Sequence, residues 1–314
     1  MAVSTHGAPL RPLVALTGAT GFVGQAVIEA ALADGFELRA LTRKSQPPRA
    51  GVQWVLGDLA DEAALAELVA GAEVVIHVAG LVNAPDPAAF HAANVVGTAA
   101  LLGAARAAGV RRFVFVSSLS AREPGLSAYG ASKAEAERWV KACGMEWTIV
   151  RPPSVYGPRD VDNFELFRAA RLGVVPVPRG GRASMIHVGD LARLLLALSL
   201  GPLGTNGAVY EPDDGRPGGW GLDEMARAIG VAVGRRRVWV LGLAPWMIRL
   251  GARIDGALRG AKARLTMDRA GYMSHPDWVV SANARPPERV WQPRIETRAG
   301  LGATADWYRR EGWL

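Results

Sequence analysis

The sequence is poor in cysteine and histidine. Its 314 residues include one cysteine, Cys143, which excludes an internal disulfide and a metal site built from several cysteines. A single cysteine also fits a reducing compartment. The histidines lack the spacing of metal ligands, so we predict no metal site, a structural role for Cys143 and a core position for His77. The five histidines are His6, His77, His91, His187 and His275.

Long apolar runs are also missing. We find no charge-free apolar stretch of the roughly 18 residues that a membrane span needs. The longest candidates, such as Val238–Ile248, are interrupted by glycine and proline. The first residues, MAVSTHGAPLR, lack the apolar run of a signal peptide. We therefore expect a cytoplasmic protein.

Acidic residues are nearly missing from one segment. The chain has 36 Lys and Arg against 29 Asp and Glu, a net charge of +7. Between Val231 and Leu265, eight basic residues stand against one acid, Asp255, so this window alone carries the surplus of seven. It indicates an anionic partner or surface, or a solvated helix face. Because it has no recognised motif for reading bases, we predict no nucleic-acid partner. The basic residues are Arg235, Arg236, Arg237, Arg249, Arg253, Arg259, Lys262 and Arg264.

The remaining composition is that of a globular protein, with half of the residues apolar and 21% charged. In the first half of the chain, short apolar runs alternate with stretches of helical length. Strands that are apolar throughout and joined by helices predict a parallel sheet covered on both faces, hence a doubly wound α/β Rossmann fold. The predicted strands are Leu13–Leu16, Glu37–Thr42, Gln53–Leu56, Val74–Val78, Arg112–Val116 and Trp147–Val150, and the helices are Phe22–Asp34, Asp61–Val69, Asn94–Ala108 and Ala128–Ala142.

The second half of the chain lacks this regular alternation of strands and helices. Prolines interrupt it, one more strand is predicted at Ala208–Glu211 and a helix at Asp223–Val233, and seven of the ten tryptophans lie from Trp220 onward. We predict a Rossmann domain over residues 10–157, completed by the strand near 208–211. A smaller, mostly helical substrate lobe follows over residues 158–314, partly interleaved with it. Ligands of such folds bind at the carboxyl edge of the sheet, where the tryptophans are compatible with an apolar pocket.

Three glycines mark a dinucleotide site. Gly18, Gly21 and Gly24 follow a predicted strand and open a predicted helix. Glycine lets the backbone turn tightly and approach a pyrophosphate, while the helix N-terminus offers free N–H groups. A glycine-rich turn without a ligand is the alternative interpretation.

The end of the second strand bears on the choice of cofactor. NAD-binding proteins usually carry an acid about 20 residues past the glycines. Here the strand ends in Leu41-Thr42-Arg43-Lys44, and two cations suit a 2′-phosphate. We predict NADP(H), with NAD(H) as the alternative. Asp58, after the third strand, is a candidate for the adenine amine or for capping the next helix.

Tyr129 and Lys133 lie four residues apart on one predicted helix, hence on one face. A nearby cation lowers the pKa of a phenol below its usual value of about 10. Tyr129 is therefore a candidate general acid or base. Ser118 ends the fifth strand at the same sheet edge and could donate to an oxyanion. The Tyr–Lys spacing alone is also common on surface helices.

The order of several short motifs strongly resembles the extended short-chain dehydrogenase/reductases. These are the NAD(P)-dependent epimerase, dehydratase and 3β-hydroxysteroid-dehydrogenase-like proteins, and the resemblance covers roughly residues 12–211. The motifs are TGATGFVG, Gly57-Asp58-Leu59, His77-Val-Ala-Gly80, Asn94-Val-Val-Gly97-Thr98, Val116-Ser117-Ser118, Tyr129-x-x-x-Lys133, Arg151-Pro-Pro-Ser-Val-Tyr-Gly157 and Ile186-His187-Val-Gly-Asp190.

This resemblance implies roles for individual residues. Ser118, Tyr129 and Lys133 are the implied catalytic set, and Asn94 holds a water of the proton relay. Ser117 and Ser120 remain rivals for the serine, because Ser118 and Tyr129 are only 11 positions apart, fewer than in many relatives. Arg151 and Tyr156 are candidate substrate contacts by family analogy, and Arg151 is equally a candidate structural ion-pair partner. The predicted cofactor contacts are Gly18, Thr20, Gly21, Phe22, Val23, Gly24, Arg43, Lys44, Asp58, Leu59, Ala79, Gly80, Tyr129, Lys133 and Pro152.

A basic amphipathic helix is predicted near residues 246–262. After Trp246, the residues Leu250, Ile254 and Leu258 recur every fourth position, and the basic residues lie outside their arc. The helix either packs this arc on the protein core or contacts a membrane surface peripherally.

These observations predict an NADPH-dependent oxidoreductase. Its substrate is a keto group in a hydrophobic, lipid-like molecule, such as a 3-keto sphingolipid or ceramide intermediate, and Tyr129 is the general acid. A nucleotide-sugar epimerase or dehydratase is one alternative, for which Arg179, Arg182 and the cluster Arg235–Arg237 could bind the diphosphate. A non-catalytic nucleotide-binding subunit, similar to an accessory subunit of respiratory complex I, is another. The sequence does not determine an oligomeric state.

Overall fold

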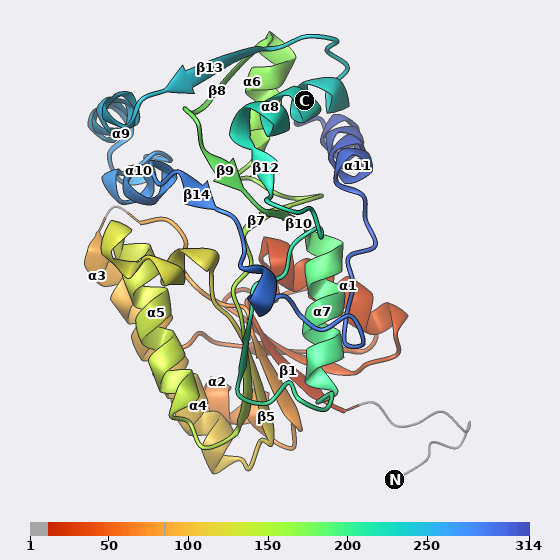
Figure 1. Cartoon of the computed structure of the whole chain (residues 1–314). Coiled ribbons are helices and arrows are strands. Elements are labelled where there is room, and N and C mark those ends of the chain that lie inside the picture. Colours follow the sequence, from red (N-terminus) through yellow and green to blue (C-terminus); the bar gives the residue numbers. More distant parts are fainter. Residues whose placement is uncertain (1–11, 85) are drawn as a thin grey trace.

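A seven-stranded sheet forms the centre of the molecule (Figure 1). The computed structural model describes residues 12–84 and 86–314. The strand order is β11-β6-β5-β4-β1-β2-β3 and every neighbouring pair is parallel, which confirms the predicted doubly wound fold. The strands are β1 (Val14–Thr17), β2 (Leu38–Thr42), β3 (Val52–Leu56), β4 (Val74–His77), β5 (Arg112–Val116), β6 (Glu146–Val150) and β11 (Ala208–Tyr210).

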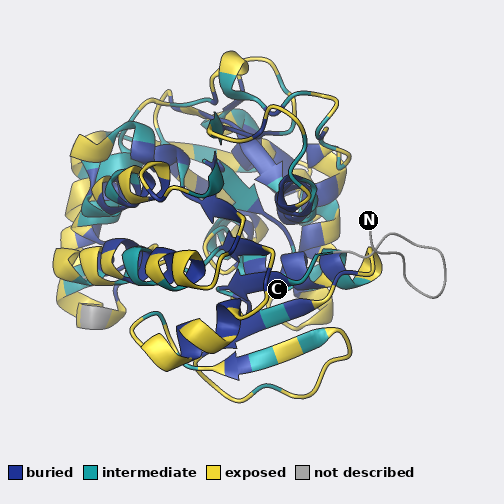
Figure 2. Cartoon of the chain, turned by 90° about the horizontal axis from the view of Figure 1, so that it is seen from below, coloured by how far each residue is buried: buried dark blue, intermediate teal, exposed yellow. Residues whose placement is uncertain are grey.

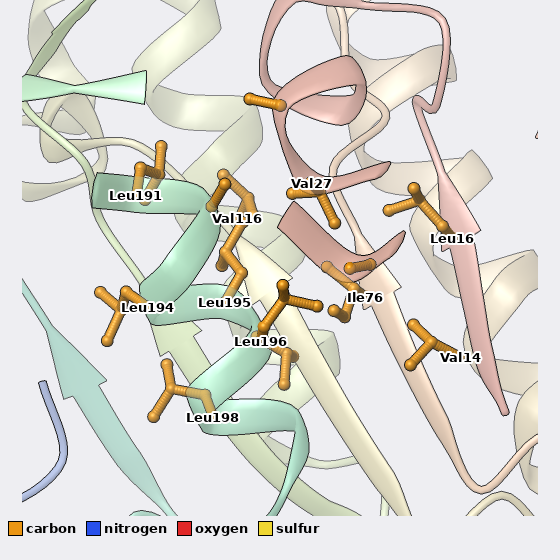
Figure 3. Close-up of a cluster of buried hydrophobic side chains, with 14 of the residues drawn as sticks. Val14, Leu16, Val27, Ile76, Val116, Leu191, Leu194, Leu195, Leu196 and Leu198 are labelled. Atoms are coloured by element: carbon orange, nitrogen blue, oxygen red, sulfur yellow. The ribbon is translucent and has the colours of Figure 1, made fainter. Parts of the chain in front are cut away.

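Helices cover both faces of this sheet, which explains why β1, β4 and β5 are buried along their whole length (Figure 2). On one face α1 (Phe22–Ala33) packs beside α7 (Val188–Ser199), and Figure 3 shows the α7 leucines together with Val27, Ile76 and Val116. The other face carries α2 (Glu62–Val69), α4 (Gly97–Ala107) and α5 (Ala128–Lys141).

The helix predicted to start at Asn94 begins earlier. It comprises α3 (Pro87–Phe90), the π-helical η1 (His91–Val96) and α4. Together Pro87–Ala107 is long and apolar enough to cross a membrane by length and composition alone, so the expectation of no such stretch was wrong. In the fold this segment packs against α2 and α5 and buries Asn94 and Thr98. Two buried polar side chains and this packing identify it as a core helix.

The second half of the chain contributes to both parts of the molecule. Helix α7 and strand β11 complete the Rossmann layers, and the division at residue 157 stays a prediction. Residues 10 and 11, the first of the predicted Rossmann domain, lie outside the described residues, as does His6. The lobe combines helices with small sheets (Figure 1). Its elements are β7 (Ser154–Tyr156), α6 (Phe164–Leu172), β8 (Val174–Pro178), β9 (Arg182–Ala183), β10 (Met185–His187), β12 (Trp220–Gly221), α8 (Leu222–Ala232), β13 (Trp239–Leu243), α9 (Pro245–Arg259), α10 (Met267–Met273), β14 (Asp277–Trp278) and α11 (Thr297–Arg310).

The tail tryptophans do not form one apolar pocket. Trp307 and Trp313 pack edge-on against each other, and the partly exposed Trp313 stacks on Tyr308 and meets Phe164 at the surface of the lobe. Trp239, by contrast, is exposed. The aromatic content of the tail therefore mainly builds the lobe rather than marking a ligand site.

Candidate functional site

The predicted site residues meet at one edge of the sheet. The strand order reverses between β1 and β4, where open α/β sheets bind ligands. Gly18, which directly follows β1, packs tightly against the loop after β4. A Cβ at this position would lie 2.6 Å from the backbone nitrogen of Ala79. A Cβ on Gly80 would lie 3.5 Å from the Nζ atom of Lys133 on α5. The loops after β1 and β4 therefore adjoin the helix that carries Tyr129.

The glycine-rich turn leaves one end of α1 open. Gly18 has φ of 71°, in the left-handed region that favours glycine, and a Cβ on Gly24 would lie 2.1 Å from the carbonyl oxygen of Gly18. The N-cap, Gly21, provides no side-chain cap, and the first turn of α1 has no acidic residue. The free N–H groups and the positive helix end suit an anion such as a pyrophosphate. The turn therefore fits a dinucleotide.

Two basic residues are exposed at the end of β2. Neither Arg43 nor Lys44 takes part in an ion pair of the described residues. Asp58 accepts a hydrogen bond from the backbone nitrogen of Ala60 at 2.8 Å, whereas the N-cap of α2 is Asp61. The alternative in which Asp58 caps that helix was therefore wrong, and Asp58 stays a predicted cofactor contact.

Ser118 is the serine that reaches Tyr129. Its hydroxyl hydrogen-bonds the phenol, and its Oγ accepts from the backbone nitrogen and the hydroxyl of Ser120 at 3.2 and 2.8 Å. Ser117 instead donates to Glu137 at 2.6 Å. The short connection from Ser118 to Tyr129 is filled by two 3₁₀ turns, η2 (Leu119–Arg122) and η3 (Pro124–Leu126). The geometry therefore favours Ser118 over its two rivals.

Burial controls the acidity of both titratable groups. It raises the pKa of Tyr129 to about 12, outweighing the hydrogen bond from Ser118, which lowers it. It lowers the pKa of Lys133 to about 7, and the Lys133 Nζ donates to the Val116 carbonyl at 2.8 Å and lies 4.4 Å from the centre of the Phe115 ring. The expectation that Lys133 would lower the pKa of Tyr129 below 10 was therefore wrong. Tyr129 is thus a protonated phenol at neutral pH, a state suited to a general acid.

Asn94 has every side-chain polar atom bound to the protein. Its Oδ1 accepts from the backbone nitrogen of Leu81 at 2.7 Å, and its Nδ2 donates to the Leu81 carbonyl and to Ser132, each at 2.9 Å. These bonds tie the loop after β4 to α5. Its own carbonyl accepts from Thr98 at 2.6 Å. The predicted water-holding role of Asn94 stays a prediction, and the observed contacts are those of a positioning residue.

Two further residues, His77 and Arg151, have structural contacts. His77 is buried between the hydroxyls of Thr17 and Thr98, at 2.6 and 2.9 Å, and burial lowers its pKa to about 3, which confirms a core histidine. Arg151 donates twice to the Glu137 carboxylate, at 2.8 and 2.6 Å. Of the two roles considered for Arg151, these contacts are those of a structural ion pair.

Tyr156 and Cys143 also lie inside the protein. Tyr156 is 1% exposed and its hydroxyl donates to the Thr297 carbonyl at 3.4 Å, which speaks against a substrate contact. Cys143 is buried in the core beneath α5, in agreement with a structural role.

Sequence reasoning missed Asp268. Its carboxylate, on α10, accepts from the backbone nitrogen of Ala128 at 2.5 Å and from that of Tyr129 at 3.4 Å. The ring of Tyr272, one turn later, has its centre 6.3 Å from that of Tyr129. Thr266 and Asp268 resemble an ordinary helix start in the sequence, so nothing local indicated a contact with a residue 140 positions away.

Comparison with known proteins places this geometry in a family. The model of the NAD dependent epimerase/dehydratase family matches residues 14–202. The chain belongs to this family. It is therefore an NAD(P)-dependent enzyme, as the motifs indicated. The comparisons do not separate NAD from NADP.

Individual relatives extend over nearly the whole chain. A ceramide reductase of Caulobacter vibrioides is 38% identical over 97% of this chain and 96% of its own length. A 2-alkyl-3-oxoalkanoate reductase of Stenotrophomonas maltophilia is 31% identical over 92% and 97%. The solved Bordetella bronchiseptica enzyme WbmG, in complex with NAD, shares the fold with a TM-score of 0.73 at 19% identity, over 97% of this chain and 96% of that one.

The buried Lys133 predicts an unusual dependence of stability on pH. Its pKa in the folded protein, about 7, is below the ordinary lysine value of 10.5, so unfolding takes up a proton between these pH values and stability rises with pH there. Lys133→Met removes this cost, so at pH 6 we expect the variant to be inactive yet more stable by roughly 1–3 kcal/mol. Thermal unfolding at pH 6 and pH 9 should show this advantage shrinking as pH rises. Arg138→Met, at an exposed position of the same helix, is the control and should show no such trend, whereas a destabilised Lys133→Met at pH 6 would contradict the assignment.

Proposed function

We propose that the protein is an NADPH-dependent reductase of the keto group of a hydrophobic, lipid-like substrate, such as a 3-keto sphingolipid or ceramide intermediate. The observation that carries this proposal is the 38% identity with a ceramide reductase along almost the full length of both chains. The second relative is named for another alkyl ketone substrate. A phenol that stays protonated at neutral pH supports reduction, because reduction needs an acid at the ketone oxygen.

The residues of the site divide this chemistry between them. Ser118 donates a hydrogen bond to the ketone oxygen, and Tyr129 transfers its proton to that oxygen as negative charge develops there. Lys133 lies beside the loops that hold the cofactor and would bind ribose hydroxyls. The cofactor supplies the hydride that the carbonyl carbon accepts. Asn94 and Asp268 keep α5, and hence Tyr129, in place against these loops.

The remaining contacts assign the cofactor itself. The turn of Gly18, Gly21 and Gly24 would hold the pyrophosphate, and Arg43 with Lys44 would hold a 2′-phosphate. The other residues proposed to contact the cofactor are Thr20, Phe22, Val23, Asp58, Leu59, Ala79, Gly80 and Pro152. NADP(H) is thus the proposed cofactor.

The proposal is tested by NADPH consumption with a detergent-dispersed long-chain 3-keto sphingoid lipid, with NADH in parallel. We expect turnover with NADPH and little with NADH. Arg43→Ser with Lys44→Ser should raise the KM for NADPH by roughly 10–100-fold, because charge-assisted hydrogen bonds are lost, and should leave the KM for NADH unchanged. Arg106→Ser with Arg111→Ser, at exposed positions of α4 and the following loop, is the control. Lack of turnover by protein that binds NADPH, or epimerisation of a UDP-sugar with retained NAD, would overturn the proposal.

We also propose that the protein is cytoplasmic and works at the inner face of the membrane, because a long-chain substrate resides there. The predicted basic helix, α9, is the part of the molecule that would make this peripheral contact. No nucleic-acid partner is proposed.

A further inference from the structure

Helix α9 packs on the protein through its minor apolar face. Ile248 and Ala252 are 3% and 2% exposed and pack with Ala270, Leu243 and Leu265. Of the two alternatives for the larger apolar arc, packing on the protein core was therefore wrong. The residues of that arc are exposed instead: Trp246 by 65%, Leu250 by 48%, Ile254 by 51% and Leu258 by 80%.

The two sets of residues lie on opposite sides of the helix. At about 100° per residue, positions 246, 250, 254 and 258 form one stripe, roughly opposite to positions 248 and 252. Arg249 and Arg253 border this stripe on one side, and both are exposed. Apolar residues flanked by arginines on one surface are the pattern of helices that lie in a membrane interface.

The strand that leads into α9 continues the exposed apolar surface. In the ribbon of β8 and β13, Trp239 pairs with Val174, and both are exposed, as is Leu241 two residues on. Val175 and Val177, on the alternate positions of β8, are buried in the lobe core. One face of the ribbon therefore holds it to the protein while the other presents an aromatic and two aliphatic side chains to solvent.

The charge around this surface is strongly positive and mostly unpaired. Of the eight basic residues between Val231 and Leu265, only Arg259 and Arg264 form ion pairs within the described residues. Arg236 and Arg237 are exposed immediately before β13, and Lys262 follows α9. A partner of negative charge is favoured here, whereas a two-fold contact with a second copy would bring two such windows together.

We propose that α9 and the β8–β13 ribbon form a docking surface for an anionic lipid bilayer. Trp239, Trp246, Leu250, Ile254 and Leu258 enter the headgroup region, and the surrounding arginines meet the anionic headgroups. Helix α9 packs on α10, whose Asp268 holds the start of the Tyr129 helix. Docking therefore brings the membrane close to the site, and only the benefit to a lipid substrate rests on the proposed function.

The test is flotation of the full chain with vesicles of phosphatidylcholine alone or with 30% phosphatidylglycerol (about one anionic lipid in three, a strongly negative surface). We expect binding to the anionic vesicles that weakens at high salt, and little binding to the neutral ones. Arg249→Gln with Arg253→Gln should lower the partition coefficient roughly thirtyfold. Leu250→Ser with Ile254→Ser should abolish binding. Arg298→Gln with Arg310→Gln, and the exposed Leu203→Ser, are the matched controls and should bind like the wild type.

Three readouts separate this proposal from the proposed function. NADPH binding and thermal unfolding of each variant should match the wild type, and turnover of a water-soluble short-chain ketone should be unchanged. Equal binding to neutral and anionic vesicles, or no effect of the α9 changes, would overturn the docking surface whatever the enzyme reduces. A dimer by size exclusion that Leu258→Ser makes monomeric would equally overturn it, in favour of a second copy.

Discussion

Tyr129→Phe is expected to lower kcat by about 10²–10⁴-fold, the usual contribution of a general acid. The change removes the proton that the ketone oxygen receives but keeps the ring that contacts Phe90 and Tyr272. The affinity for NADPH and the unfolding temperature should therefore stay near those of the wild type. Steady-state kinetics with the long-chain keto lipid, alongside fluorescence titration of NADPH, would show this separation.

A matched control is available in Tyr210→Phe. Its hydroxyl donates to the Gly204 carbonyl at 3.4 Å, on the edge strand β11 and away from Ser118 and Lys133. It should keep full turnover. Turnover by Tyr129→Phe at the wild-type rate would remove the phenol from the mechanism, and loss of both turnover and NADPH binding in a folded variant would make the phenol a cofactor contact rather than the general acid.

Arg151→Met is expected to destabilise the protein by about 3–5 kcal/mol, because the buried Glu137 carboxylate loses two short hydrogen bonds and Lys141, 3.8 Å away, is its remaining cation. Arg151 donates twice to Glu137, whose side chain is 2% exposed, and lies 3.7 Å from Glu211, whose side chain is 5% exposed. These contacts join α5, β6 and the end of β11. Because Glu137 also accepts from Ser117, the loss should disturb the end of β5, where Ser118 lies. Urea unfolding measures the change in stability.

The double change Arg151→Met with Glu137→Gln distinguishes an ion pair from simple packing. If the cost comes from the buried carboxylate that has lost the Arg151 guanidinium, the double variant should be clearly more stable than Arg151→Met alone. The amide oxygen of the glutamine can still accept from Ser117. Additive costs of the two changes would show that the pair contributes packing alone. Arg138→Met, an exposed residue of the same helix, should change stability by less than about 0.5 kcal/mol.

Much of the fold could be predicted because its signals are local. The strands Arg112–Val116 and Val74–His77 are mostly apolar and buried along their whole length, because helices cover both faces of the sheet. Their boundaries agree with the predicted strands to within one residue. The glycine-rich turn could also be predicted, since the backbone around Gly18 and Gly24 leaves no room for a Cβ atom. Helical spacing likewise placed Tyr129 and Lys133 on one face of α5.

The pKa values of Tyr129 and Lys133 could not be predicted from the sequence. Spacing suggested that Lys133 would act on Tyr129 through its charge, but burial dominates both groups and moves their pKa values in opposite directions. Burial depends on the surrounding layers, including α10 from the far end of the chain. For the same reason Asp268 could not be recognised as the residue that holds the start of α5.

The sequence by itself determined the parallel sheet, the dinucleotide turn, the positions of Ser118, Tyr129 and Lys133 along the chain, and the basic window, because each depends on residue type and spacing within a few turns or strands. The tertiary structure alone decided that Ser118 rather than Ser117 meets the phenol, that Arg151 serves Glu137, and that α9 turns its larger apolar stripe outward. An amphipathic pattern predicts that a helix has an apolar face to bury. Which element packs against that face depends on contacts between residues distant in the chain. Here Ala270 and Leu265 cover the side of Ile248, and the stripe from Trp246 to Leu258 is left to solvent.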